Sequence, residues 1–157
     1  MNKKYELTSD FTVWCGRKLF RIKALISFGN VSAGEIGGYI EKEENLKVSG
    51  DAWVYDNARV SGNARVSGDA RVSGDAEVSK RTHMLQIGFI GTRDAVTTFF
   101  RVKTNEIHVV CGCFMGSIGE FEKAVEEAHK GTKHETTYKL AIQLAKAQIE
   151  LTSEDEA

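Results

Sequence analysis

Two cysteines and two histidines in the C-terminal half of the chain are of types that could bind a metal. One residue separates Cys111 from Cys113, and four separate His129 from His134. Two thiolates and two imidazoles can form a tetrahedral zinc site, but structural zinc pairs usually have about two to four residues between the cysteines. A Cys-x-Cys pair on a strand would instead place both thiols on one face. We therefore expect no metal, with the thiols filling a sheet and the histidines at helix ends.

The same residues contain one combination that could support nucleophilic catalysis. Cys113 could act as a nucleophile, with His129 or His134 as its base. Nothing in the order of the chain requires these side chains to meet. We name no catalytic residue and no cofactor, and we keep a Cys/His hydrolase as an alternative.

A glycine-flanked corner, "CGCFMGSIGEF", is a candidate site for an anion. Free backbone amides at a helix N-terminus favour an anion, and Arg93, if its turn lies close by, would add a guanidinium that grips phosphate or carboxylate. Alternatively, the glycines only form a turn, Ser117 only caps the helix, and Arg93 pairs with Asp94 or Glu120. The residues that we predict to bind a ligand or partner are Arg93, Asp94, Gly116, Ser117, His129, His134 and Tyr138.

Three predicted strands and two predicted helices must position these side chains. The strands are "MLQIGFIGT", "AVTTFFRVK" and "EIHVVCGCF", and they favour an antiparallel meander of three or four strands. Ser117 and Glu120 have the spacing of a capping box, and Gly131 ends the first helix. The expected apolar face of the first helix is Phe121, Val125 and Ala128, and that of the second is Tyr138, Ile142, Ala145 and Ile149.

Before this region, a six-residue repeat runs through "DNARVSGNARVSGDARVSGDAEVS". Valine recurs every six residues from Val48 to Val78, and alanine precedes each of the last five valines by two positions. A helix would spread these valines around its axis. Short Ala-x-Val strands separated by Ser-Gly-Asn/Asp corners instead predict a triangular solenoid, with three hexads in each coil.

In such a solenoid, residues 18 apart in the sequence stack on one another. Val54 is expected under Val72 and Val60 under Val78, Arg59 on Glu77, and Trp53 beside Arg71 at an exposed site. Arg59, Arg65 and Arg71 would then lie on three different sides and form no stripe for nucleic acid. We therefore expect no binding of nucleic acid.

The phasing "A-x-V-x-G-x" resembles the hexapeptide repeat of left-handed parallel β-helices, best known from bacterial acyltransferases, over residues 46–80. The resemblance implies the fold more strongly than an activity. Those acyltransferases carry a catalytic histidine on the coil, whereas the four histidines of this chain, His83, His108, His129 and His134, all follow the repeat. An acyltransferase is therefore only an alternative.

The segment before the repeat is expected to cap the first coil, because a two-coil solenoid has open ends. "KYELT", "FTVWC" and "KLFRIKAL" are predicted to be three short strands, with a turn at Gly16 and Arg17. Ile36 falls in the phase of the repeat, twelve residues before Val48, but the intervening position is Lys42. We expect this first coil to be irregular.

Composition excludes several classes of protein. The 22 acidic and 21 basic residues nearly cancel, so no overall charge attracts nucleic acid or a membrane. The sequence shows neither a long apolar run nor an apolar stretch after "MNKKYELTSD", so we expect no membrane partner and no signal peptide. Three cysteines without an export signal are expected to be free thiols.

A second resemblance covers nearly the whole chain. The stretches "YELT…LFRIKAL…FGNVSAGEIGGYIE", "WVYDNARVSGNARVSG" and "IGFIGTRD…TTFF…VVCGCFMGSIGEFEKAVEEAH" are similar to phage and prophage proteins that join hexapeptide repeats to a small C-terminal α/β domain. This similarity implies a phage origin more firmly than an activity. Small accessory phage proteins often act on host systems, including host defence. With no signal peptide expected, we predict a location in the host cytoplasm.

Together these observations predict a mixed β and α+β protein: a short left-handed parallel β-helix of about two to three coils, then a small antiparallel sheet with two helices. The expected parts are an N-terminal β cap (1–45), the hexapeptide-repeat β-helix (46–80), an α+β domain (83–151) and an acidic tail (152–157). We expect a non-enzymatic interaction protein that engages a host protein through its C-terminal domain. Its flat coil sides are expected to form a homo-oligomer, either a trimer or a dimer. A binder of a small phosphorylated or nucleotide ligand is the alternative.

Overall fold

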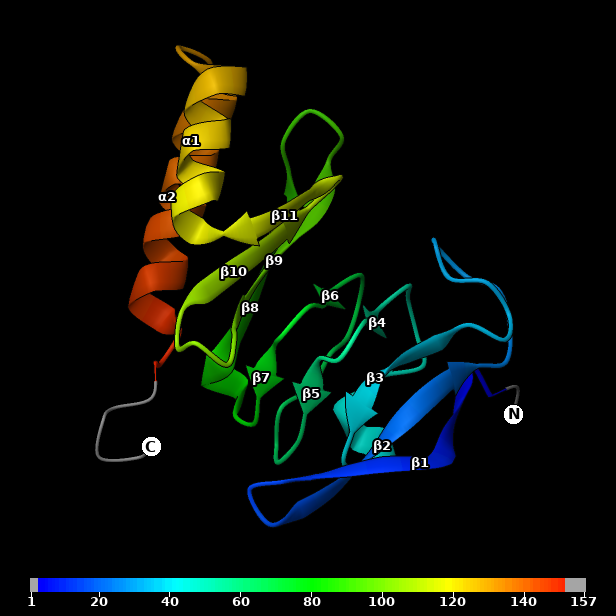
Figure 1. Cartoon of the computed structure of the whole chain (residues 1–157). Coiled ribbons are helices and arrows are strands. Elements are labelled where there is room, and N and C mark those ends of the chain that lie inside the picture. The colour runs from blue at the N-terminus through cyan, green and yellow to red at the C-terminus, as the bar shows by residue number, and fades with distance from the viewer. Residues whose placement is uncertain (1–2, 152–157) are drawn as a thin grey trace. The chain divides into compact units, whose positions relative to one another are not determined.

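The structure is a computed structural model, and it describes residues 3–151 of the chain. The expected acidic tail, residues 152–157, lies outside the described residues. The chain divides into two compact units, residues 1–81 and 82–157, each of which is described by itself (Figure 1).

The repeat region of the first unit is a β-solenoid with a core of small side chains. The expected inner alanines and the valines from Val54 to Val78 are all at most 1% exposed. Ala-x-Val therefore points both side chains inward, as predicted. The strands are short, and their bounds are β4 (Trp53–Val54), β5 (Arg59–Val60), β6 (Arg71–Val72) and β7 (Glu77–Val78).

The parallel pairing confirms the predicted stacking of residues 18 apart. β4 pairs with β6 through Trp53–Arg71 and Val54–Val72, and β5 pairs with β7 in the same register. Arg59 Nη1 lies 4.0 Å from Glu77 Oε1, which matches the expected charge pair. The expectation of an exposed Trp53 was wrong, because its indole is fully buried, with Tyr5 and Phe28 against it edge to face.

The corners of the solenoid use backbone conformations that favour glycine. Gly50 and Gly62 have positive φ angles of 76° and 61°, and a Cβ on either would collide with the carbonyl of a neighbouring coil. Asp56 takes the same place in its hexad with a φ of 56°. Its carboxylate accepts a hydrogen bond of 2.9 Å from the Gly74 amide of the next coil, which compensates for the less favourable backbone.

Two expected inner positions of the first coil were wrong. Ile36 and Val48 are 51% and 55% exposed, whereas Ile40 and Leu46 are buried and pair with Val60 and Val66. The phase shifts because eight residues, rather than six, separate Leu46 from the next inner valine, Val54. The extra residues enlarge one corner, so residues of this coil stack on residues 20 positions later.

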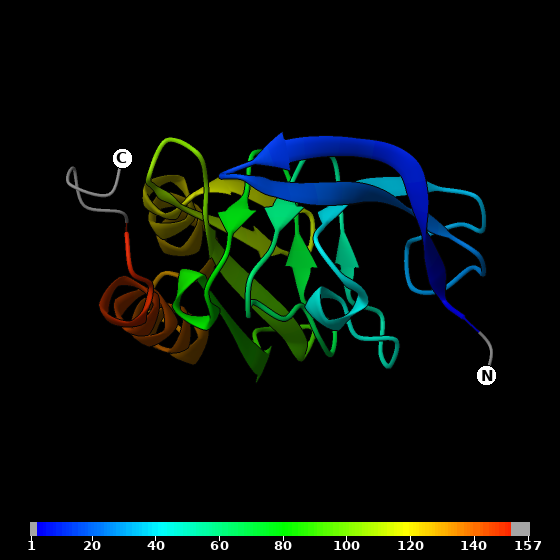
Figure 2. The same cartoon turned by 90° about the horizontal axis from the view of Figure 1, so that it is seen from below.

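Three longer strands extend one side of the solenoid into a five-stranded sheet with the order β1-β2-β3-β5-β7. Figure 2 shows β3, β5 and β7 side by side. The hairpin β1–β2 is antiparallel and pairs with β3, as expected for a segment that covers the first coil. The bounds are β1 (Tyr5–Trp14), β2 (Arg17–Ala24) and β3 (Ile36–Ile40).

The prediction of two separate strands before Gly16 was wrong, because β1 is continuous. Leu7 pairs with Ile22 and Phe11 with Phe20, so β1 uses two more residues than β2 over this stretch. Such a bulge lets a strand absorb extra residues without a turn. The polar pair Ser9–Asp10, which suggested a break, lies inside this bulge.

The second unit is a four-stranded antiparallel meander with two helices on one face (Figure 1). Its sheet order, β11-β10-β9-β8, confirms the predicted antiparallel meander, which has four strands. The bounds are β8 (Met84–Ile90), β9 (Ala95–Arg101), β10 (Ile107–Cys111), β11 (Phe114–Ser117), α1 (Ile118–His129) and α2 (Lys133–Gln148). Short 3-10 helices cover Glu43–Asn45 and Arg81–His83.

The helices pack on the sheet through an aromatic core. Phe121 of α1 makes edge or tilted contacts with Phe99, Phe114 and Tyr138. The expected face of α2 is confirmed, since Tyr138, Ile142, Ala145 and Ile149 are all at most 7% exposed. The expected face of α1 is one turn too long, because Ala128 is exposed where the helix extends past the core.

Candidate functional site

The predicted anion corner at the start of α1 already holds a carboxylate. Ser117 Oγ accepts a hydrogen bond of 3.2 Å from the Glu120 amide. In return, Glu120 Oε1 accepts bonds of 3.2 Å from the Ser117 amide and 2.9 Å from its hydroxyl. These bonds hold the pKa of Glu120 below its ordinary value, and the bond from the Ser117 backbone amide has the largest effect. Glu120 thus takes the place that the prediction gave to an external anion.

Arg93 lies at the other end of β11 from this corner. Its Nη1 is 3.9 Å from the point that a Cβ on Gly112 would occupy, in the turn between β10 and β11. β11 then runs from Phe114 to Ser117, a span of roughly 10 Å. The structure therefore brings Arg93 to the Gly112 turn and not to Gly116 and Ser117. Arg93 and Asp94 are both exposed, in the turn between β8 and β9.

Three of the predicted residues do come together where the two helices meet. The His129 ring lies 5.6 Å from the ring of His134 and 5.6 Å from that of Tyr138, with which it is stacked at 28°. His129 is the last residue of α1, and the other two lie in the first turns of α2. The tight connection through Gly131, with a φ of 78°, makes this approach possible.

A chain of three polar groups leads from Tyr138 into the sheet. The Thr97 hydroxyl donates to Cys111 Sγ at 3.4 Å, and the Cys111 thiol donates to Tyr138 Oη at 3.7 Å. Burial, followed by the bond to Cys111, raises the pKa of Tyr138 to about 12. Gly91 packs so closely on the Tyr138 hydroxyl that no side chain fits there. This closed arrangement stabilises the packing of α2 on the sheet.

The two cysteines do not share a face, contrary to the prediction. Cys111 is the last residue of β10 and points into the core, whereas Cys113 is exposed in the turn that follows. The reason is Gly112, whose φ of 58° reverses the chain between them. Within residues 3–151, no group of three or more His, Cys, Asp and Glu side chains is arranged to hold a metal ion.

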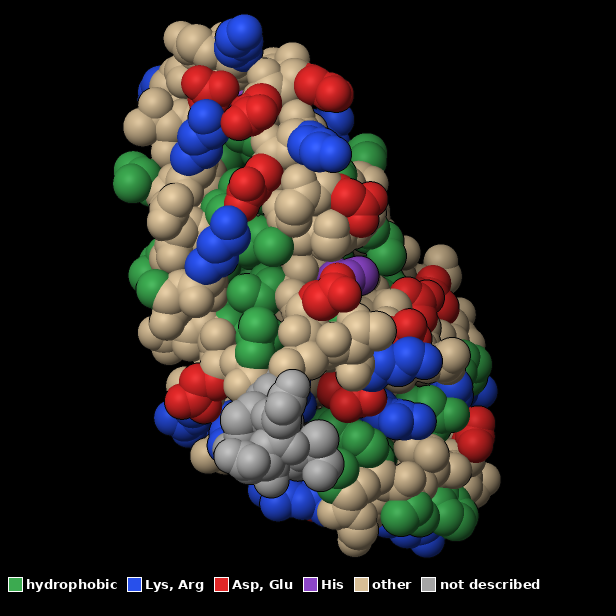
Figure 3. Space-filling model, turned by 60° about the vertical axis from the view of Figure 1, so that its left-hand side comes forward, with side chains coloured by type: hydrophobic (Ala, Val, Ile, Leu, Met, Phe, Trp, Pro, Cys, Tyr) green, Lys and Arg blue, Asp and Glu red, His purple; other side chains and the backbone are tan. Residues whose placement is uncertain are grey.

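The second unit has a charged groove along α1 and α2. It has a volume of about 630 Å³. A smaller hollow of about 180 Å³ continues it and shares Glu126 and Lys139 with it. Figure 3 shows lysine and carboxylate side chains alternating along this face. We call this feature the helix groove; its lining residues are Lys123, Glu126, Glu127, Lys130, Glu135 and Lys139.

Ion pairs lie along the helix groove and the hollow that continues it, two between the helices and one within α2. Lys139 Nζ lies 3.5 Å from Glu126 Oε1 and 3.7 Å from Glu135 Oε2, and Lys146 pairs with Glu122. All of these pairs are partly exposed, so each contributes only about 0–1 kcal/mol to stability. The three lysines and three carboxylates of the lining balance each other, so a small anion would find no net attraction.

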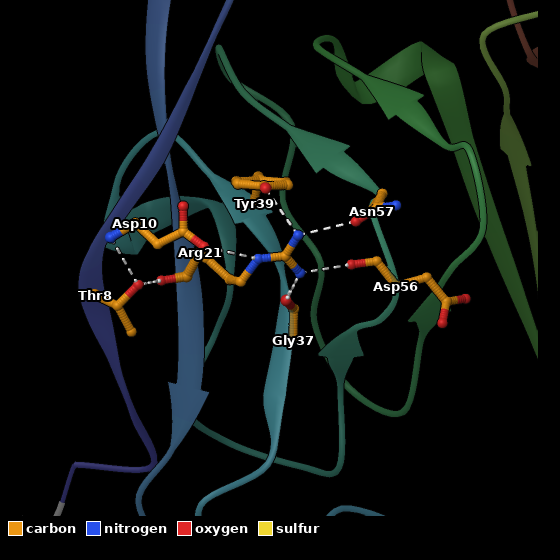
Figure 4. Close-up of polar contacts among 7 residues, drawn as sticks. All are labelled: Thr8, Asp10, Arg21, Gly37, Tyr39, Asp56 and Asn57. Carbon is orange, nitrogen blue, oxygen red and sulfur yellow. Dashed lines mark hydrogen bonds and ion pairs between the residues drawn. The ribbon is translucent and has the colours of Figure 1, made fainter.

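In the first unit, Arg21 joins the N-terminal hairpin to the solenoid (Figure 4). Its guanidinium donates to the carbonyls of Gly37 and Asp56 at 2.8 and 3.1 Å. It also donates to Tyr39 Oη at 2.7 Å and to Asn57 Oδ1 at 2.9 Å. These partners are mainly backbone groups or neutral side chains, so the cluster fixes the hairpin in place and does not resemble a catalytic centre.

Two neighbouring side chains close the open end of the first coil. Lys4 Nζ donates to the carbonyls of Gly50 and Ala52 at 3.1 and 2.7 Å, and burial lowers the pKa of Lys4. Tyr5 Oη lies 3.0 and 2.7 Å from the carbonyls of Glu43 and Leu46, and burial raises its pKa. These donors replace those that a further coil would supply.

Sequence reasoning missed the helix groove and both of these clusters. The groove had a signal, because "EFEKAVEEAHK" alternates acidic and basic residues along a helix. Lys4, Tyr5 and Arg21 had none, because their partners are mainly backbone carbonyls far away in the sequence.

Comparison with known proteins identifies the repeat. A family model described as the YdcK beta solenoid repeat matches residues 52–67, 58–74 and 64–80, with starting points six residues apart. The comparison with curated proteins gave no match. Among the helices that the structure describes, none has the length and apolar character needed to cross a membrane. Residues 52–80 are thus similar to the YdcK beta solenoid repeat.

Proposed function

We propose that this chain is a non-enzymatic, phage-encoded interaction protein that binds a host protein in the host cytoplasm. Its solenoid, which we infer to be left-handed from its hexapeptide phasing, serves as scaffold. The second unit carries the surface for the host protein. The observation that carries this proposal is the helix groove, an open and charged surface along α1 and α2.

The balance of charge in the helix groove favours a protein over a small ligand. Lys123 and Lys130 lie among carboxylates, so the groove presents alternating signs and not a single field. A protein surface can match such a pattern, and charge complementarity then determines which partner binds and how fast. A phosphorylated ligand has less support, because it would meet the Glu126 and Glu135 carboxylates, and Glu120 occupies the other candidate position.

An enzymatic role also has less support. A hexapeptide acyltransferase requires a histidine on the coil, and all four histidines follow residue 80. A Cys/His hydrolase requires an activated thiol, but Cys111 is directed to Tyr138 and Cys113 lies in an exposed turn. A role in countering host defence is the part of the proposal that depends most on the resemblance to phage proteins.

Affinity purification of the tagged chain from infected cells tests the proposal. We expect one host protein to co-purify with the wild-type chain and to be lost from a Lys123→Glu/Lys130→Glu variant, because charge reversal places like charges against the partner. The matched control is Arg65→Glu, which changes a charge on the solenoid surface. If both variants retain the host protein, or both lose it, the helix groove is not its binding site.

A further inference from the structure

The outer face of α2 carries a stripe of apolar side chains. Leu140 and Leu144 are 65% and 50% exposed, and Ala147 is exposed as well. Their spacing of four and three residues places them on one line, opposite the face that packs on the sheet. This is the a/d spacing by which one helix packs against another. We call these three residues the leucine stripe.

The charges of α2 are arranged so that they leave the leucine stripe free. Lys139 and Lys146 form ion pairs with Glu126 and Glu122 of α1. The residues that flank the stripe are neutral, namely Thr136, Thr137, Gln143 and Gln148. Within α2, the one charged residue on the line of the stripe is Lys133, seven positions before Leu140.

We propose that the leucine stripe binds the same stripe of a second copy of this chain, with the two α2 helices antiparallel about a two-fold axis near Leu144. A two-fold interface brings identical patches together, so its patches must complement themselves. In this arrangement Leu140 meets Ala147 of the second copy, a large side chain against a small one. Each Lys133 lies beyond the C-terminal end of the other α2, far from the Lys133 of the second copy.

The alternative pairings are less favourable on the same grounds. Parallel helices would place Lys133 beside Lys133 of the second copy, and like charges at such a contact are destabilising. A helix of a different protein would need charges beside the stripe to be selected, and the flanks of the stripe offer none. The inference goes beyond the proposed function and does not depend on the host partner.

The size of the leucine stripe limits the affinity. α2 has 16 residues and is therefore about 24 Å long. A contact of this length buries less than the roughly 1,600 Å² of a standard stable interface. We therefore expect a dissociation constant in the micromolar range, with monomers at lower concentration.

Sedimentation velocity over a concentration series tests the interface. We expect the wild-type chain to form dimers, and Leu140→Gln/Leu144→Gln to raise the dissociation constant at least tenfold. Both leucines are at least 50% exposed, so the variant should fold, which circular dichroism checks. The matched control is Phe11→Gln/Val13→Thr, which removes equally exposed apolar groups from β1 and should leave the dimer unchanged. A wild-type monomer at several hundred micromolar, or a glutamine variant that still dimerises normally, would overturn the proposal.

Disulfide crosslinking tests the antiparallel direction. In a Cys15→Ser/Cys113→Ser background, Leu144→Cys should oxidise to a covalent dimer because it lies near the axis. Thr137→Cys should not, because two copies of residue 137 would be roughly 20 Å apart, beyond the roughly 7 Å that a disulfide spans between Cα atoms. Crosslinking of Thr137→Cys as efficient as that of Leu144→Cys would overturn the antiparallel arrangement.

Loss of the dimer with retention of the host protein would separate this inference from the proposed function.

Discussion

The two units achieve a buried core in different ways. In the solenoid, an inner valine such as Val54 stacks on Val72, and the same small contact recurs from coil to coil. In the second unit, Phe121 contacts three different aromatic rings, and no contact is repeated. In the solenoid, the position of a residue within the six-residue repeat therefore determines whether its side chain is buried. In the second unit, burial depends on the particular contacts that each side chain makes.

The largest expected effect tests whether phase decides burial in the solenoid. Val66 is fully buried and pairs with Leu46, whereas Val48, three hexads earlier, is 55% exposed. We expect Val66→Asn to lower the free energy of unfolding by about 3–5 kcal/mol, because it removes an apolar group and buries an amide. Val48→Asn should change it by less than about 0.5 kcal/mol. Urea denaturation measures both, and similar losses would show that phase does not determine burial.

The next effect concerns the cap on the first coil. We expect Lys4→Met to lower the free energy of unfolding by about 2–3 kcal/mol, because the carbonyls of Gly50 and Ala52 lose their shared donor. Lys3 is the matched control, since its ammonium pairs with Glu43 at 3.6 Å on the surface and is 67% exposed. Lys3→Met should cost less than about 0.5 kcal/mol. Equal effects in thermal or chemical denaturation would mean that the cap does not depend on buried donors.

A pair of glycines tests the importance of single contacts in the second unit. Gly91 and Gly131 both have positive φ, but only Gly91 packs against a side chain, the Tyr138 hydroxyl. We expect Gly91→Ala to cost about 2 kcal/mol, from the backbone and the collision together. Gly131→Ala should cost about 1 kcal/mol, from the backbone alone. If denaturation shows no difference, the contact between Gly91 and Tyr138 contributes nothing.

The smallest effect concerns the helix caps. We expect Ser117→Ala to cost about 1 kcal/mol, because it removes half of the capping box of α1. Thr132 holds the same position in α2 but makes no side-chain cap bond, so Thr132→Ala should cost less. The helical signal at 222 nm during denaturation measures both, and a larger loss for Thr132→Ala would contradict the assignment of the caps.

The sequence predicted those parts of the fold whose patterns are local or periodic. The stacking of Val60 on Val78 follows from the period, and the cap at Ser117 follows from its spacing to Glu120. The period failed where its spacing changed. Between Leu46 and Val54, two extra residues shift the inner positions of the repeat. The sequence does not indicate which residues form the enlarged corner.

The candidate site was less predictable because it depends on contacts between distant segments. His129, His134 and Tyr138 meet because of the tight connection between the helices, which Gly131 signals. The separation of Arg93 from Ser117 depends on the hairpin at Gly112, which lies in an apolar stretch that resembles one continuous strand. The polar partners of Lys4 and Arg21 are mainly backbone atoms, which carry no information in the sequence.

The stacking of residues 18 positions apart has a consequence for how such a chain can change in length during evolution. A duplication or deletion of three hexads adds or removes one whole coil, so the chain enters and leaves the stack on the same sides as before. A change of one hexad moves the exit to the next side of the triangle, by about a third of a turn. Tandem copying in steps of 18 residues could therefore lengthen this protein while its first coil keeps the same cap.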